Sequence, residues 1–511
     1  MATPQTDIAP NNLPLDQVVA HWGAVYPDRT VLSYYDGSSP REVRWGEFNV
    51  MIVNMAARLS AHVHAGDSVA VLCANGVAFH VLVNALWRLG AGVLLLDRHW
   101  GPAIVEDLLA LVHCHTLFSE TGGAAYAGSA MKLRAFPSLD TAPPPELTLL
   151  APQPGSMDRV ALYATTSGTT DNPKCVAITH RQLRAAYHTC LNIHDFSVVR
   201  RGACLFELNS LGVLGVCFLL PREVGGGTKV FPSFSIANVA ATWRGVLDDA
   251  IDFVYLVPPL VRLINTLPAR DVTQRRLLAF CASAPVTEQE LQKLEEKFPL
   301  RIFNCYGLTE LTFAVFFGCR NEDGTASESI GLPQGIQARL VDEDGAPISG
   351  KGQGELLLNG PMLTDGYLHN LSATQATWDQ GWLKTGDVAE CDAQGRYFIR
   401  GRKKDAVLRG SYIYYLHELE HYLRRVPSVI DACAFKGRDL PSGDELCVVV
   451  QASAPLAPAT LLQWIRVNMG SNKVPNVLYV WQRGLPRNSN GKVLRQELAR
   501  MHADNSIYTG A

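Results

Sequence analysis

Residues 162–174 read LYATTSGTTDNPK, a run rich in hydroxyl side chains that ends in a proline and a lysine. An apolar, strand-like stretch, Val160–Tyr163, leads into this run, and a second one, Cys175–Ile178, leads out of it. Hydroxyl and backbone N–H groups on a tight turn can surround phosphate oxygens, and a lysine adds a point charge for them. The run lacks the GxxxxGK[ST] spacing of a P-loop and any GxGxxG pattern. A hydroxyl-rich surface turn is the alternative, but it does not explain the terminal Pro-Lys, so the run favours phosphate binding.

Length and composition describe a large, ordinary globular protein. The chain has 511 residues, more than a single hydrophobic core usually serves, so we expect two or more domains. Hydrophobic residues make up 47% of the chain and charged residues 18%, as is usual for globular proteins. The formal net charge of -3 gives no electrostatic indication of a nucleic-acid partner.

Cysteine usage and the length of apolar segments indicate the cellular compartment in which the protein is expected. The 12 cysteines are scattered without CxxC pairs, which favours a reducing compartment and argues against a disulfide framework and against a zinc site. Residues 1–14 are polar and rich in proline and asparagine, unlike a signal peptide. Apolar runs such as residues 213–220 are too short to span a bilayer. We therefore expect a cytoplasmic protein without a membrane partner.

Helix-like and strand-like patterns alternate up to about residue 320. Residues 45–64 have the apolar spacing of a helix, residues 68–73 read as a buried strand, residues 79–89 as a helix and residues 93–96 as a strand. This βα alternation is typical of parallel sheets covered by helices. The sequence therefore predicts an α/β fold for the larger part of the chain.

The pattern changes after Gly331. Short strands separated by turns that contain Gly and Asp are predicted at residues 337–341, 354–358, 388–391 and 397–399. They indicate a small antiparallel or barrel-like region. A basic cluster at residues 401–405 interrupts this pattern, and the remaining residues are enough for a further small domain of βα type.

Five short motifs occur in order over nearly the whole chain. They are the hydroxyl-rich run Thr165–Lys174, YGLTE at 306–310, TGD at 385–387, GRKKD at 401–405 and NGK at 490–492. Together they resemble the motifs of the adenylate-forming superfamily, which includes acyl- and aryl-CoA synthetases, adenylation domains of peptide synthetases and luciferases. Because five ordered motifs rarely agree by chance, the chain is identified as a member of this superfamily.

The resemblance implies an α/β fold with a mobile part. Residues 1–400 would form an N-terminal adenylation domain of βα-type sheets with a small barrel-like subdomain. Residues 401–405 would form a hinge, and residues 406–511 a small mobile α+β C-terminal domain. Such enzymes join a carboxylate oxygen to the α-phosphate of ATP, which gives an acyl-adenylate and releases pyrophosphate. Catalysis of this step is mainly positioning and electrostatic stabilisation of phosphoryl oxygens.

The resemblance also assigns the contacts to ATP and its metal. The residues expected to hold the phosphates are Thr165, Ser167, Gly168, Thr169, Thr170 and Lys174. Tyr306 and Gly307 would belong to the nucleotide site, with the Tyr306 ring stacked on adenine, and Thr309 would bond the α-phosphate. Glu310 would hold Mg²⁺, which prefers oxygen ligands. The plainer alternatives are a core aromatic for Tyr306 and an exposed glutamate for Glu310.

Four further residues complete the implied site. Asp387 and Arg402 would bond the ribose hydroxyls, whereas the plainer reading is a turn aspartate and a surface arginine. Lys492 would neutralise the charge that develops between carboxylate and α-phosphate. Lys404 lies at the hinge position, where the small domain would rotate between two half-reactions.

Departures from the family pattern bear on the second substrate. Asp171 and Cys175 replace two glycines of the phosphate loop, and Asp171 brings a negative charge near a polyphosphate. Ser411 stands where thioester-forming relatives have a glycine that backs onto the pantetheine channel, and the tyrosines that follow would crowd this channel. In the alternative register the loop shifts by one residue and Gly410 takes that role.

Glu207 lies where acyl- and aryl-CoA synthetases often carry a histidine and amino-acid adenylation domains an aspartate. It could act as a base or anchor for an amine, replace the amino-acid-binding aspartate, or face structure and solvent. The apolar residues 211–215 and the Val257–Pro259 segment, which is similar to an acid-pocket wall, favour an apolar acyl or aryl acid.

The sequence thus predicts an ATP- and Mg²⁺-dependent carboxylate ligase. We expect an amine acceptor, such as an amino acid, and an amide product, because the chain resembles stand-alone amide ligases of bacterial secondary metabolism such as coronafacate–amino acid ligases. The alternatives are an acyl- or aryl-CoA synthetase and an enzyme that loads a carrier protein. A nucleotide-binding regulator is the non-enzyme alternative, and the intact Lys492 argues against it because binding alone would not require this lysine.

Overall fold

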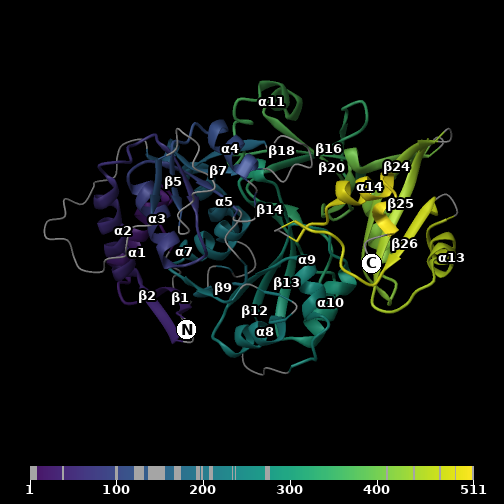
Figure 1. The fold of residues 1–511 in the computed structure, drawn as a ribbon, viewed down its shortest axis with the longest axis horizontal. Helices are drawn as coiled ribbons and strands as arrows, with labels where there is room; N and C mark the ends of the chain where they lie inside the picture. Colours follow the sequence, from purple (N-terminus) through teal and green to yellow (C-terminus); the bar gives the residue numbers. More distant parts are fainter. Residues whose placement is uncertain are drawn as a thin grey trace.

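Figure 1 shows the fold of the chain in a computed structural model. The structure describes residues 8–36, 39–97, 100, 102–119, 132–135, 156–165, 174–191, 196, 199–206, 211–232, 234–235, 237–270, 277–409, 412–440, 443–470, 473–488 and 491–508. Within these ranges, each helix is too short or too polar to serve as a bilayer-spanning segment.

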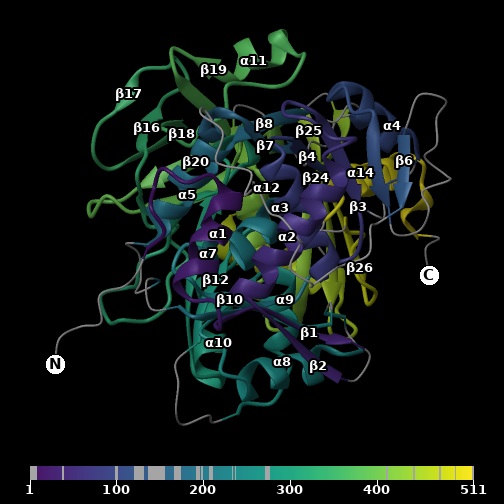
Figure 2. The same ribbon diagram turned by 90° about the vertical axis from the view of Figure 1, so that its left-hand side faces the viewer.

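A six-stranded sheet carries the hydroxyl-rich run. Its strand order is β6 (Lys132–Ala135), β5 (Thr116–Ser119), β3 (Ser68–Leu72), β4 (Gly92–Leu95), β7 (Val160–Thr165) and β8 (Cys175–Thr179). Neighbouring strands are parallel except β7 and β8, which are antiparallel. The helices around this part of the chain are α1 (Leu15–Val25), α2 (Trp45–Leu59), α3 (Val77–Arg88), α4 (Pro102–Leu111) and α5 (His180–Leu191). Figure 2 shows α1, α2 and α3 packed together.

A nine-stranded sheet forms the second large layer. Its order is β15 (Leu332–Pro333), β14 (Ala314–Phe317), β13 (Leu300–Gly307), β12 (Leu277–Cys281), β11 (Phe253–Leu256), β9 (Arg201–Cys204), β10 (Gly227–Val230), β1 (Thr30–Asp36) and β2 (Ser39–Arg44). The connecting helices include α6 (Leu211–Val213), the π-helix η4 (Leu214–Leu219), α7 (Leu220–Arg222), α8 (Val239–Asp248), α9 (Pro258–Ile264) and α10 (Glu288–Lys297).

The predicted βα alternation is confirmed, with antiparallel strands added at the sheet edges. The predicted strand at 68–73 is β3, whose residues from Val69 onward are buried, and the predicted helix at 45–64 is α2, which ends at Leu59. Strands β9 to β13 are parallel where they pair. By contrast β1 pairs antiparallel with β2, because the two residues between them leave room only for a hairpin.

The region after Gly331 forms an antiparallel sheet, as predicted. Its order is β17 (Pro347–Ile348), β16 (Gln337–Val341), β18 (Gly352–Asn359), β20 (Trp382–Cys391) and β19 (Trp378–Asp379), with β21 (Tyr397–Arg402) paired to β20. Helix α11 (Leu371–Thr377) precedes β19. Two of the turns that contain Gly and Asp, at residues 342–345 and 392–395, are closed by Asp342 and Asp392, whose carboxylates accept backbone N–H groups.

The last hundred residues form a separate layer of sheet and helices, drawn in yellow-green and yellow at one end of the molecule in Figure 1. Its strands are β22 (Ala406–Arg409), β23 (Tyr412–Tyr415), β24 (Val429–Leu440), β25 (Gly443–Ala452) and β26 (Val477–Trp481), and its helices α12 (Leu416–Leu423), α13 (Pro458–Met469) and α14 (Arg495–Ala503).

Two of its hydrophobic clusters contain only residues from Val407 to Ile507, whereas the clusters of the preceding chain end at Cys391. Separate cores agree with a small C-terminal domain. The boundaries at residues 400 and 406 and the mobility of this domain stay predictions.

Candidate active site

The strand pair β7–β8 brings the ends of the hydroxyl-rich run together. Thr165 is paired in register with Cys175, so Lys174, which directly precedes β8, lies beside the end of β7. The Lys174 ammonium lies 4.7 Å from the centroid of the Tyr367 ring. Ser167, Gly168, Thr169 and Thr170 lie outside the described residues, and their phosphate contacts stay predictions.

Tyr367 connects Lys174 with Glu310. The Tyr367 hydroxyl donates a 2.6 Å hydrogen bond to Glu310 Oε1, while the Glu310 carbonyl accepts the N–H of Thr364 at 2.9 Å. Burial and the neighbouring Glu310 raise the pKa of Tyr367. The fold thus brings together two residues that the motifs named, Lys174 and Glu310, through a tyrosine that they did not name.

The backbone of the YGLTE segment is tightly constrained. A Cβ at Gly307 would lie 2.3 Å from the carbonyl oxygen of Phe313, so only glycine fits there. Thr309 and Glu310 follow in a short 3₁₀ helix, η5 (Thr309–Leu311), and both are half-buried. Thr312 then takes a φ of 66°, and its hydroxyl donates to the carbonyl of Met362 at 2.7 Å. These contacts hold the backbone that presents Thr309 and Glu310.

Asp387, Tyr306 and Arg402 form one hydrogen-bonded group. Asp387 is 2% exposed, and it pairs in register with Arg402 across strands β20 and β21. Its carboxylate accepts the Tyr306 hydroxyl at 2.7 Å and Arg402 Nε at 2.6 Å. Burial and Asp387 raise the pKa of Tyr306, so its hydroxyl stays protonated and donating. The motif residues 306, 387 and 402 therefore meet in one place.

Lys492 belongs to the C-terminal part but lies close to Arg402. Gly491 takes a φ of +76°, and a Cβ there would lie 3.4 Å from Pro259 Cγ, so this loop is seated against the Val257–Pro259 segment. Burial, then Arg402 and Lys404, lower the pKa of Lys492 to about 8. No carboxylate of the described residues lies within ion-pair distance of its ammonium group. The site therefore carries surplus positive charge, which fits a phosphate-bearing anion.

A second charged group fixes the Lys492 loop to the N-terminal part. Arg487 donates to the Gly491 carbonyl at 2.8 Å and also pairs with the buried carboxylate of Asp431 on β24. Arg262 of α9 reaches the same carboxylate at 3.3 Å and pairs with Glu290 at 2.6 Å. The contacts thus run from helices α9 and α10 to the residue next to Lys492.

The two carboxylates in this chain of contacts, those of Glu290 and Asp431, are fixed by further interactions. Glu290 closes a capping box at the start of α10, in which its carboxylate accepts the N–H of Thr287 at 2.7 Å. Burial alone would raise the pKa of Asp431, but Arg262, Arg424 and Arg487 hold it well below its usual range. Asp431 is therefore charged across the working pH range.

The structure says less about the remaining predicted site residues. Lys404 is exposed and lies in the 3₁₀ turn η6 (Lys403–Asp405), whose Lys403 pairs with Glu355 at 2.8 Å. Its hinge role stays a prediction. Glu207 and Ser411 lie outside the described residues, so the base or anchor role of Glu207 and the crowded channel stay predictions as well.

Sequence reasoning missed Tyr367 and the Asp431 group. Tyr367 lies outside the five motifs, and its position depends on an isolated bridge to Val176 on β8. Asp431 and Arg262 are separated by 169 residues and meet only in the folded chain. The one local signal was an aspartate within an otherwise apolar stretch of β24.

Comparisons with known proteins place these observations in a family. A family model described as AMP-binding enzyme matches residues 19–368. A feruloyl-CoA synthase from Amycolatopsis sp is 30% identical over 478 residues, which cover 89% of this chain and 93% of that protein.

Solved structures share the fold. The o-succinylbenzoate coenzyme A synthetase from Bacillus subtilis, in complex with ATP and magnesium ion, has a TM-score of 0.80 at 22% identity and covers 95% of this chain and 99% of its own. The amide bond synthetase McbA from Marinactinospora thermotolerans has a TM-score of 0.82 at 20% identity and covers 96% of this chain and all of its own.

The predictions of superfamily, α/β fold class and AMP-forming acid ligase are confirmed by these findings, and ATP with magnesium agrees with them. The family model spans more than half of the sequence and includes both the hydroxyl-rich run and the YGLTE segment. The chain therefore belongs to the AMP-binding enzyme family.

Proposed function

We propose that this enzyme activates an apolar acyl or aryl acid as its adenylate and then transfers the acyl group to the thiol of coenzyme A. The observation that carries the first step is the Lys492 side chain. It is a desolvated cation beside Arg402, on a loop seated against Pro259. A half-buried cation without a carboxylate partner in the described chain supports a site that receives an anion.

The described residues fit ATP and a magnesium ion. Asp387 accepts hydrogen bonds and Arg402 donates them, as ribose hydroxyls require. Lys174 would contact the phosphates. Glu310 has one carboxylate oxygen engaged by Tyr367 and can offer the other to magnesium, which would offset the negative charge of the phosphate oxygens when bound.

Lys492 would act on the transition state of adenylation. A carboxylate oxygen of the acid forms a bond to the α-phosphorus while the bond to pyrophosphate breaks. Negative charge from the acid and from the α-phosphate comes together at this point. A protonated Lys492 would stabilise that charge more than it stabilises bound ATP, which is the condition for faster catalysis.

The acceptor proposed here differs from the amine that the sequence favoured. A curated relative with 30% identity is a feruloyl-CoA synthase, which supports the coenzyme A alternative better than the amide reading. The amide bond synthetase neighbour shares the fold at 20% identity and keeps an amine acceptor as the second candidate. The aromatic acid named for the feruloyl relative agrees with an apolar aryl acid.

We also propose that residues 401–405 act as a hinge between the two half-reactions. Lys492 is tied to the N-terminal part through Arg487, Asp431 and Arg262, so transfer to a thiol would require these contacts to open. Lys404→Pro would fix φ at the proposed pivot. We expect normal adenylation and lost acyl transfer, measured as separate half-reactions. Equal slowing of both steps in a folded variant would place the hinge elsewhere.

One experiment separates the acceptors. The protein is incubated with ATP, Mg²⁺ and a panel of apolar acyl and aryl acids, first alone and then with coenzyme A or with amino acids and amines. Mass spectrometry should detect an acyl-adenylate without acceptor and an acyl-CoA thioester with coenzyme A. If an amide forms from an amine and no thioester is detected, the enzyme is an amide ligase and the coenzyme A proposal is wrong. Absence of adenylate with every acid would contradict both.

A further inference from the structure

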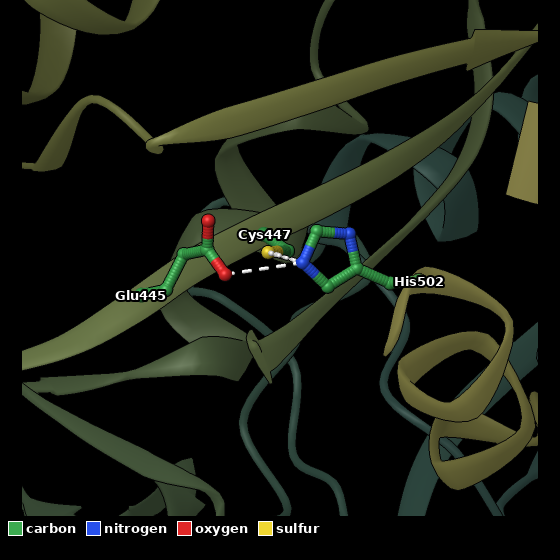
Figure 3. Close-up of side chains that lie close together, drawn as sticks. All are labelled: Glu445, Cys447 and His502. Carbon is green, nitrogen blue, oxygen red and sulfur yellow. Dashed lines mark hydrogen bonds and ion pairs between the residues drawn. The ribbon is translucent and has the colours of Figure 1, made fainter. Parts of the chain in front are cut away.

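We propose that Glu445, Cys447 and His502 form a zinc-binding site in the C-terminal part of the chain. Glu445 and Cys447 are two residues apart on β25 and therefore point to the same face of the sheet. His502 comes from α14, which packs against this sheet. Figure 3 shows the three side chains converging, and their ligand atoms all lie within 4.8 Å of one another.

The separations agree with tetrahedral zinc. Cys447 Sγ lies 3.6 Å from His502 Nε2, and this nitrogen lies 3.1 Å from Glu445 Oε2. With zinc bonds of about 2.3 Å to sulfur and about 2.0–2.2 Å to nitrogen and oxygen, tetrahedral angles separate sulfur and nitrogen by about 3.6 Å and nitrogen and oxygen by about 3.4 Å. One ion can therefore reach all three atoms with small side-chain shifts.

The surroundings orient the proposed ligands. The Tyr479 hydroxyl lies 2.8 Å from His502 Nδ1, so the imidazole can donate Nδ1–H to this oxygen and offer the Nε2 lone pair to a metal. Zinc-binding histidines are usually held in this way by a partner on the other ring nitrogen. The Arg438 backbone N–H donates to Glu445 Oε2 at 2.9 Å and fixes the carboxylate.

Charge and ligand type favour zinc over magnesium. A thiolate and an imidazole suit zinc, whereas magnesium prefers oxygen. Binding would release the thiol proton of Cys447, and with the Glu445 carboxylate the two negative ligands balance the ion. Cys447 is fully buried and His502 nearly so, while Glu445 is half-buried, so a fourth ligand such as water can approach on the carboxylate side.

These ligands differ from the expectation in the sequence, where the scattered cysteines argue against a zinc site. The ligands form Glu-x-Cys on a strand and a histidine 55 residues further on, so no CxxC pattern arises. The site would join α14 to the sheet, and α14 begins three residues after Lys492. Zinc would therefore stabilise the segment that positions this lysine, whatever acid or acceptor the enzyme uses.

The test measures metal binding by the full-length protein. After chelator treatment and buffer exchange, the chain is titrated with zinc against a chromophoric chelator, and separately with cobalt, whose bond to a thiolate gives a near-ultraviolet charge-transfer band. We expect one zinc per chain, the cobalt band, and a higher thermal unfolding midpoint with zinc. Cys447→Ala and His502→Gln should weaken zinc binding about a hundredfold or more, and Tyr479→Phe about tenfold.

Cys319→Ala is the matched control, because Cys319 is a half-buried thiol elsewhere in the chain and should leave binding unchanged. If the other ligand variants fail to fold, Glu445→Gln takes their place, because Glu445 is the more exposed ligand; it should also weaken zinc binding. The proposal is overturned if the native chain takes up no stoichiometric zinc and shows no cobalt–thiolate band. It is equally overturned if zinc affinity is unchanged in the ligand variants or falls as much in Cys319→Ala.

Discussion

Two charged clusters lie where the C-terminal part meets the rest of the chain, and they differ in charge balance. Around Asp431, the carboxylates include Asp431, Glu290 and Glu420, and each contacts at least one arginine. Around Lys492, burial and then the cations Arg402 and Lys404 lower the lysine pKa, and Asp405 raises it. In the first cluster every carboxylate is directly paired with an arginine, whereas no carboxylate of the described residues lies within ion-pair distance of the Lys492 ammonium group.

The difference indicates a structural role for the Asp431 cluster and agrees with the proposed catalytic role for Lys492. A buried cluster of ion pairs loses much of its stabilisation if one partner is removed, and its charged groups already have partners within the protein. A desolvated surplus cation is unfavourable in the free protein and becomes favourable when an anion arrives. In the proposed mechanism, the Asp431 group fixes the pose in which Lys492 would stabilise charge that develops on phosphoryl oxygens.

Asp431→Asn should have the largest effect on stability. The change leaves Arg262, Arg424 and Arg487 around a neutral amide, and breaking a buried pair costs about 3–5 kcal/mol. Urea unfolding followed by circular dichroism and tryptophan fluorescence measures it, and adenylation should slow as well. Asp379→Asn, in an exposed pair with Lys384, is the control and should cost below about 1 kcal/mol. Similar stability of the two variants would show that the Asp431 cluster does not hold the pose.

Lys492→Ala should remove most of the adenylation rate while ATP affinity changes little. In the proposed mechanism the lysine acts on charge that develops in the transition state, and loss of one such donor costs about 2.7–4 kcal/mol, or about two to three decades in rate. Single-turnover rates and calorimetric ATP binding separate the two quantities. Lys473→Ala removes a lysine of the same domain that pairs with Glu418 and should leave the rate unchanged. A rate near that of the native enzyme in Lys492→Ala would refute the assignment.

Asp387→Ala should weaken ATP and AMP binding. Each hydrogen bond to a charged group contributes about 1.5–3 kcal/mol, and the change also leaves Arg402 without its carboxylate. Calorimetric titration with each nucleotide provides the measurement. Asp392→Ala, a turn aspartate on the same sheet, is the matched control. Unchanged nucleotide affinity in Asp387→Ala would mean that this aspartate only organises the strand.

The smallest expected effect is a pH dependence of the Lys492 cluster. Adenylation should fall as pH rises through about 8, where the free enzyme loses the active protonated lysine. The folded pKa lies below the unfolded value of about 10.4, so the unfolded chain binds more protons between these values and the nucleotide-free protein gains stability as pH rises. ATP should raise this pKa by a fraction of a unit, in keeping with the small change of ATP affinity expected for Lys492→Ala, so calorimetry in two buffers near pH 8 should show partial proton uptake that Lys492→Ala abolishes. Identical proton uptake by the native protein and by Lys492→Ala would show that another group takes up the proton.

The sequence was enough for the family and the α/β layers, because local motifs and hydrophobic periodicity carry that information. Tyr306, Asp387 and Arg402 were expected in one nucleotide site and are joined by hydrogen bonds. Tyr367 and the Arg262–Asp431 contact were not foreseen, since they arise from side chains far apart in sequence. The three proposed zinc ligands escaped the cysteine pattern for the same reason.

Acid-dependent exchange of labelled pyrophosphate into ATP is the sharpest test of adenylation, because it reports this reversible step whichever acceptor follows. We expect exchange that requires Mg²⁺ and an apolar acyl or aryl acid, and that falls about two to three decades in Lys492→Ala. Exchange at the native rate in Lys492→Ala would refute the proposed role of this lysine, and absence of exchange with every acid tested would refute adenylation.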